Sequence, residues 1–181
     1  TQVLNPTQLQ KITVTVSNVR GTLLEAATYK INPNFVAAPP TLTLTQRNLR
    51  WYQNADSVNP TTPLAAENAA YTATALGEVY RLRMSVEVGG LALSTGGQVF
   101  KLQYATSTGG PWSDMGAAGS GTIWRGYDNT SVADGTAITS LLLSGSNVME
   151  SYEEQNPSAA NPNPFSVGQW GEWDWVVQEN G

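Results

Sequence analysis

Residues 78–88 read EVYRLRMSVEV, and this run decides the fold class. Apolar side chains alternate with polar or charged ones along it, which is the period of a half-buried β-strand. The apolar positions are Tyr80, Leu82, Met84, Val86 and Val88. The polar positions are Arg81, Arg83, Ser85 and Glu87. The run therefore predicts a strand with one face on a core and the other toward solvent.

Other short runs with strand character lie on both sides of this one. They span residues 11–17 (KITVTVS), 22–31, 41–44, 48–53, 99–105, 122–124, 137–143 and 170–178. Turn signals such as Gly89-Gly90 separate them. The Ala-rich segment 63–75 is expected to form one helical turn at most. Many short strands at this spacing predict an all-β fold, a Greek-key-like β-sandwich of immunoglobulin-like or jelly-roll-like type.

The composition excludes several classes of function. The 181 residues include no cysteine and no histidine, so zinc sites, disulfides and Ser-His-Asp catalysis are excluded. We expect a non-enzymatic protein with no cofactor. The net charge is −5 and the nine Lys and Arg residues are scattered, which argues against nucleic acid as a partner. We also expect no membrane span, because no stretch approaches about 20 apolar residues.

The composition changes near Pro39-Pro40, after which aromatic residues become frequent. We expect an N-terminal extension at residues 1–40, containing the clean strand pattern of 11–17. The β-sandwich domain is expected at residues 41–181.

Eight phrases of the sequence resemble a known family. They lie at 49–68 (LRWYQNADSVNPTTPLAAEN), 80–88, 100–107, 111–116, 124–129, 132–139, 152–157 and 171–178. Together, and in this order, they are similar to a recurring β-sandwich domain of large, uncharacterised extracellular proteins of uncultivated bacteria. The resemblance implies a secreted or cell-surface location and a structural or adhesive role. It implies no catalytic chemistry.

The sequence departs from this family at both ends. In the family pattern the phrase matching 171–181 is followed by one more strand, whereas this sequence stops at Gly181 and offers an additional strand at 11–17. That strand could complete its own domain or enter a neighbouring subunit, and we favour the second alternative. Strand addition between molecules would build a head-to-tail homopolymer. Ile12, Val14 and Val16 would then form the donor-strand interface.

We therefore expect a structural subunit of an extracellular filament or surface assembly. One alternative is a carbohydrate-binding or adhesive module, in which Trp112 and Trp124 would contact glycans or a cell surface because they sit near turns and beside polar residues. That alternative requires exposed, coplanar tryptophans. Another alternative is a virion structural protein of the capsid or tail.

Three further residue groups have a chemical interpretation and a simpler one. Glu172 and Asp174 could form a pair of carboxylates for glycoside hydrolysis, but Trp173 and Trp175 look like core, which would leave the two acids on the solvent face. Asn129 opens a glycosylation sequon. Calcium could bind oxygen ligands in two acidic stretches, although neither has a regular ligand spacing. These stretches are Glu153-Glu154 and the group Asp128, Asn129 and Asp134.

Overall fold

The computed structural model describes the backbone of residues 9–18, 21–31 and 38–181, and the side chains from residue 38 onward. The chain divides into two compact units, Thr1–Pro39 and Pro40–Gly181. Every regular element in the described ranges is a strand, which confirms the all-β prediction. Within the same ranges no helix is long and apolar enough to cross a membrane, and the Ala-rich segment 63–75 contains no helical turn.

The first unit contains an antiparallel hairpin of β1 (Leu9–Asn18) and β2 (Gly21–Ile31). Both strands were predicted, at 11–17 and 22–31. The register sets Val14 opposite Ala26 and Val16 opposite Leu24. The side chains of Ile12, Val14 and Val16 lie outside the described part of the structure.

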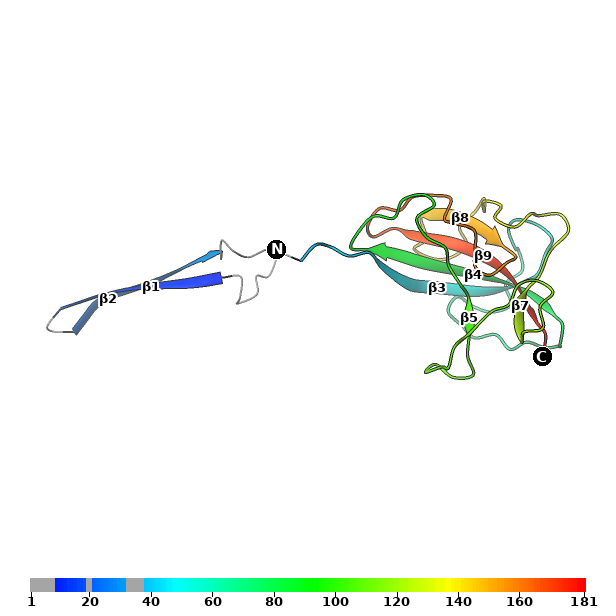
Figure 1. The fold of residues 1–181 in the computed structure, drawn as a ribbon, viewed down its shortest axis with the longest axis horizontal. Coiled ribbons are helices and arrows are strands. Elements are labelled where there is room, and N and C mark those ends of the chain that lie inside the picture. The colour runs from blue at the N-terminus through cyan, green and yellow to red at the C-terminus, as the bar shows by residue number, and fades with distance from the viewer. Residues whose placement is uncertain (1–8, 19–20, 32–37) are drawn as a thin grey trace. The chain divides into compact units, whose positions relative to one another are not determined.

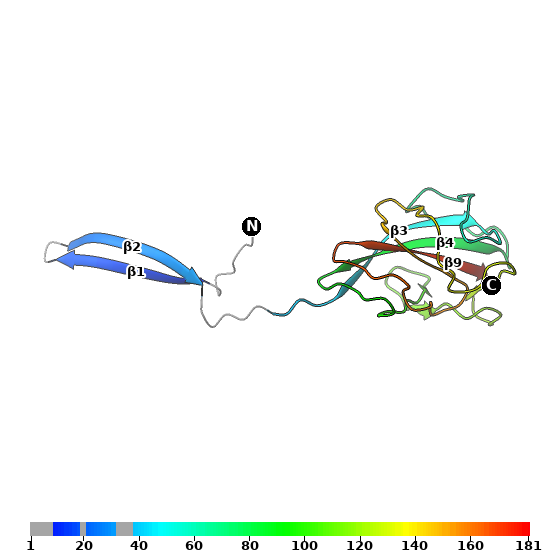
Figure 2. The same cartoon turned by 90° about the horizontal axis from the view of Figure 1, so that it is seen from above.

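The second unit is organised around one sheet of three long antiparallel strands (Figures 1 and 2). These are β3 (Thr43–Gln53), β4 (Val79–Gly89) and β9 (Trp170–Glu179), with β4 in the middle. The predicted runs 41–44 and 48–53 form the single strand β3, interrupted by an irregularity between Gln46 and Leu49. Two shorter strands also pair with β9. They are β7 (Trp124–Gly126), which is antiparallel, and β8 (Val148–Glu153), which is parallel.

The apolar face of this sheet packs against a less regular layer. A small antiparallel pair, β5 (Gln103–Tyr104) and β6 (Ser113–Asp114), belongs to that layer. The buried core contains Tyr80, Leu82, Val88, Leu93, Met115, Val148, Phe165, Trp173, Trp175 and Val177. The sheet and this covering layer give a sandwich-like fold.

Two predicted strands differ from the structure. Only Gln103 and Tyr104 of the run 99–105 are in a regular strand, because much of this segment is hydrogen-bonded to asparagine and serine side chains instead. The run 137–143 is not a strand; a single bridge joins Ala137 to Ser151 of β8. The strand β8 was not predicted from the sequence.

The prediction that Glu172 and Asp174 face solvent is wrong. Both acids lie on the face opposite Trp173 and Trp175, as the alternation predicts, but neither is accessible to solvent. Segments around Val58, Val132 and Ile138 cover this second face. The sheet is therefore covered on both sides.

Candidate functional site

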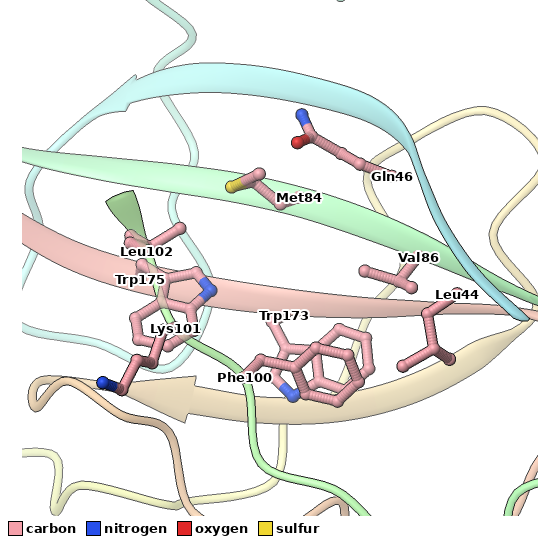
Figure 3. A pocket seen from close by; sticks show the side chains of 9 residues that line it. All are labelled: Leu44, Gln46, Met84, Val86, Phe100, Lys101, Leu102, Trp173 and Trp175. Carbon is pink, nitrogen blue, oxygen red and sulfur yellow. The ribbon is translucent and has the colours of Figure 1, made fainter. Parts of the chain in front are cut away.

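An open apolar groove runs along the sheet of the second unit. It comprises two adjoining pockets of about 240 and 390 Å³ that share Gln46, Met84 and Leu102. In Figure 3, β3 with Leu44 and Gln46 lies on one side of the smaller pocket, and the segment carrying Phe100 and Leu102 lies on the other. We call the two pockets together the groove.

The floor of the groove follows from the alternating pattern of the central strands. Met84 and Val86 of β4, with Trp173 and Trp175 of β9, line the smaller pocket. Phe100 already covers part of β9, because its ring centroid lies 4.4 Å from that of Trp173. The indole Nε1 of Trp173 has no hydrogen-bond partner among the described residues. The floor over β3 and β4 is less completely covered, and Leu44 is 38% exposed.

One side of the groove is an open strand edge at the start of β3. The Val88 amide donates to the Gln169 carbonyl, and the Val88 carbonyl accepts from the Gly168 amide. Both main-chain groups of Val88 therefore point away from β3. Because Leu44 lies opposite Val88 and Gln46 opposite Val86, the main-chain groups of Leu44 and Gln46 point away from β4. Within the described ranges these groups have no hydrogen-bond partner. The later half of the same edge is covered, for example by the bond from the Leu64 amide to the Trp51 carbonyl.

The other side of the groove is a second open edge. The amides of Gln98, Phe100 and Leu102 donate to the side chains of Asn161, Ser158 and Asn156, respectively. In extended backbone, the main-chain amides and carbonyls of alternate residues point in opposite directions. Those of Val99 and Lys101 therefore point away from the asparagine and serine side chains. For these two residues, the described structure shows a main-chain hydrogen bond only to the Val99 carbonyl, a 3.4 Å contact from the Gln98 side chain.

The two tryptophans singled out from the sequence both line the larger pocket. Trp124 is half-buried, and its ring lies 6.2 Å from that of Trp51 at an interplanar angle of 42°. Trp112 is 54% exposed. Of these two tryptophans, Trp112 has the exposure that the carbohydrate-binding alternative requires, and Trp124 is less accessible.

The acids on the second face form a buried ionic network. Arg81 donates to Asp174, and Arg83 donates to Glu172 at 2.9 Å. Arg83 Nε also lies 2.9 Å from Asp174 Oδ2, without hydrogen-bond alignment. Glu172 further accepts from the amides of Leu142 and Leu143. With these partners Glu172 and Asp174 hold the covering segments, and neither carboxylate reaches solvent.

The other acidic side chains, considered above as calcium ligands, are also buried or hydrogen-bonded within the protein. Glu153 and Glu154 are buried at the end of β8 and just after it. Burial raises the pKa of both carboxyls. The Asp134 carboxylate accepts from the amide of Glu154. No group of three or more acidic side chains in the described part of the chain is arranged to hold a metal ion.

Asn129 lies in a half-buried position at the sequon. Its side-chain Nδ2 donates to the Tyr152 hydroxyl at 2.7 Å, and its main-chain nitrogen donates to the Glu154 carboxylate. Nδ2 also donates to Asn54 Oδ1 at 3.2 Å. A glycan replaces one of the two hydrogens on Nδ2, so it would have to displace one of these two bonds.

Comparison of the chain with protein-family models, curated proteins and solved structures finds no match. The groove was not foreseen as a set of residues. Its floor could be read from the alternation in β4 and β9, but the open edges depend on which main-chain groups remain unpaired after folding.

Proposed function

We propose that this chain is a structural subunit of an extracellular filament or surface assembly, and that it polymerises by donating an N-terminal β-strand to a neighbouring subunit. The observation that carries the proposal is the groove between the open edge of β3 and the open edge of the extended segment 98–102. Its role is association rather than turnover, with a second copy of this chain as the partner.

An open edge beside apolar core is costly for an isolated domain. Unpaired amides and carbonyls offer a template for another strand, and natural sheets usually cover or charge such edges. Here the groove has a floor of Met84, Val86 and tryptophan side chains. It is bordered by main-chain amides and carbonyls of Leu44, Gln46, Val99 and Lys101. The chemistry that fits is an extended segment that supplies main-chain hydrogen bonds at its edges and apolar side chains toward the floor.

The N-terminal unit supplies a segment of this kind. β1 contains Ile12, Val14 and Val16 at alternate positions, and these would face the floor when Thr13 and Thr15 face away. Main-chain bonds would give affinity, and the alternate side chains would set the register. The extracellular location rests on the family resemblance.

Deleting Thr1–Ala38 tests the proposal. The remaining unit keeps its own core and is expected to be monomeric in sedimentation, while the full chain assembles and shows filaments or sheets by electron microscopy. A peptide of residues 9–31 should bind the truncated protein. A matched peptide with Ile12→Thr, Val14→Thr and Val16→Thr keeps the strand propensity and should bind at least tenfold more weakly. Assembly of the truncated protein, or a full chain that stays monomeric, would refute the proposal.

A second candidate, a carbohydrate-binding module, is favoured by one observation. Trp112 is exposed at the edge of the groove, where a flat ring could stack on a sugar. Under this candidate, glycan-array binding would be lost in Trp112→Ala and retained after deletion of residues 1–38.

A further inference from the structure

We infer that the donated element is the intact β1–β2 hairpin, which enters the groove of a second copy as a two-stranded unit. This inference rests on the proposed function and specifies the form of the donor. It also assigns β2 a role that the sequence pattern alone did not suggest.

The first reason is that β1 is already paired. All ten of its residues have partners in β2, from Leu9 opposite Ile31 to Asn18 opposite Gly21. Donating β1 alone would break this ladder before any new bonds form. Donating the hairpin keeps the ladder and uses its outer edges, which have no strand partner in their two-stranded sheet.

The second reason is the register of the hairpin. Residues directly opposite each other in an antiparallel pair share one face of the sheet. The register sets Ile12, Val14 and Val16 opposite Thr28, Ala26 and Leu24. One face therefore carries five apolar positions from both strands, whereas β1 alone would present three. An isolated two-stranded sheet is marginally stable in water and gains most from covering such a face.

The third reason is the width of the uncovered floor. The groove is lined by Leu44, Gln46 and Leu49 of β3 and by Leu82, Met84 and Val86 of β4. Phe100 already covers part of β9. Trp173, Trp175 and Val177 of β9 also line the groove, so its floor reaches across three neighbouring strands. This floor is wider than one added strand, which favours a two-stranded cover. One outer edge of the hairpin would pair at Val99 and Lys101, and its other strand would lie beside Leu44 and Gln46.

The length of the connection limits how far the hairpin can lie from the second unit. The chain from Ile31 to Thr43 spans at most about 40 Å.

A disulfide lock tests the inference. The chain has no cysteine, so Thr13→Cys with Ala27→Cys introduces the only possible bridge. These positions are directly opposite each other and lie on the face away from Val14. Opposed residues have Cα atoms about 4.5 or 5.5 Å apart, within the range that a disulfide spans. Thiol titration verifies closure, and each single cysteine variant is a control.

The expected result is that the oxidised double variant assembles to the same extent as its reduced form, within about twofold by light scattering. Assembly only after reduction would show that a single strand is donated, which overturns this inference and leaves the proposed function intact. A bridge that cannot close would also overturn it, because the register would be wrong. If neither form nor the wild type assembles, the proposed function itself is wrong.

Discussion

Glu150 is a fully buried carboxyl group in β8 whose two oxygens have no hydrogen-bond partner among the described residues. Burial raises its pKa to about 8; the nearby Asn163 amide opposes this shift without completing a bond, and Glu153 adds to it. In the unfolded chain the same group has a pKa near 4.5. The folded state therefore retains a proton that the unfolded state releases, and stability should fall as the pH rises from about 4.5 to 8.

We predict that Glu150→Gln removes much of this pH dependence. The amide cannot ionise, so the variant should match the wild type near pH 4.5 and exceed it at pH 9 by a few kcal/mol at most, since one pKa unit corresponds to about 1.4 kcal/mol. Urea unfolding at the two pH values measures the difference. Glu153 and Glu154, whose pKa values burial also raises, should leave the variant a residual slope.

Glu179→Gln, at the half-buried end of β9, is the control for replacing a strand glutamate of this sheet by glutamine. If Glu150→Gln is less stable than the wild type at pH 9, the carboxylate has a partner that stabilises its charged form.

The residue scale also shows what an alternating pattern can and cannot predict. The pattern correctly separates Trp173 and Trp175 from Glu172 and Asp174 by face. It cannot predict burial, because the segments that cover the acids lie far away along the chain. The Leu142 amide that bonds Glu172 is 30 residues away.

At the element scale, prediction succeeded for the long strands whose apolar and polar residues alternate regularly. β4 and β9 are long, and their apolar and polar residues alternate regularly. Both strands could therefore be predicted from this period of two residues alone. β8 was missed because the charged residues of VMESYE, Glu150 and Glu153, are three positions apart and break the alternation of a strand, and because they are buried only by the completed fold. The run 99–105 was predicted as a strand because its side chains alternate, although the amides of Phe100 and Leu102 donate to side chains rather than to a neighbouring strand.

The open edge at Lys101 gives a prediction at this scale. Lys101→Pro removes an amide proton that has no partner in the described structure, so it should not disturb the bonds of Phe100 and Leu102. It should abolish assembly, because proline cannot donate to an added strand. Analytical ultracentrifugation measures assembly, and thermal unfolding measures stability.

Lys101→Ala is the matched control, since both substitutions remove the exposed pair with Asp114, which is worth at most about 1 kcal/mol. The alanine variant keeps the amide proton and should assemble normally. Equal assembly of the two variants would show that the Lys101 amide makes no bond in the assembly.

At the scale of the whole molecule, the proposed assembly uses different surfaces of one chain as donor and acceptor. A molecule that both donates and accepts generates a head-to-tail series, which stays open unless its geometry closes a ring. The truncated protein without residues 1–38 keeps the groove and lacks the hairpin. In the proposed assembly it would accept a hairpin from the last subunit but would have no hairpin to donate to the next one.

We therefore predict that truncated protein shortens the assemblies of the full chain well below equimolar amounts. One truncated molecule per ten full-length chains should reduce the mean length to roughly ten subunits, because each blocked end stops growth in one direction. Electron microscopy measures the lengths, and truncated protein carrying Lys101→Pro is the matched control, since its groove edge cannot pair. If shortening requires an excess of truncated protein, or if the control shortens assemblies equally, the subunits are not joined through the groove.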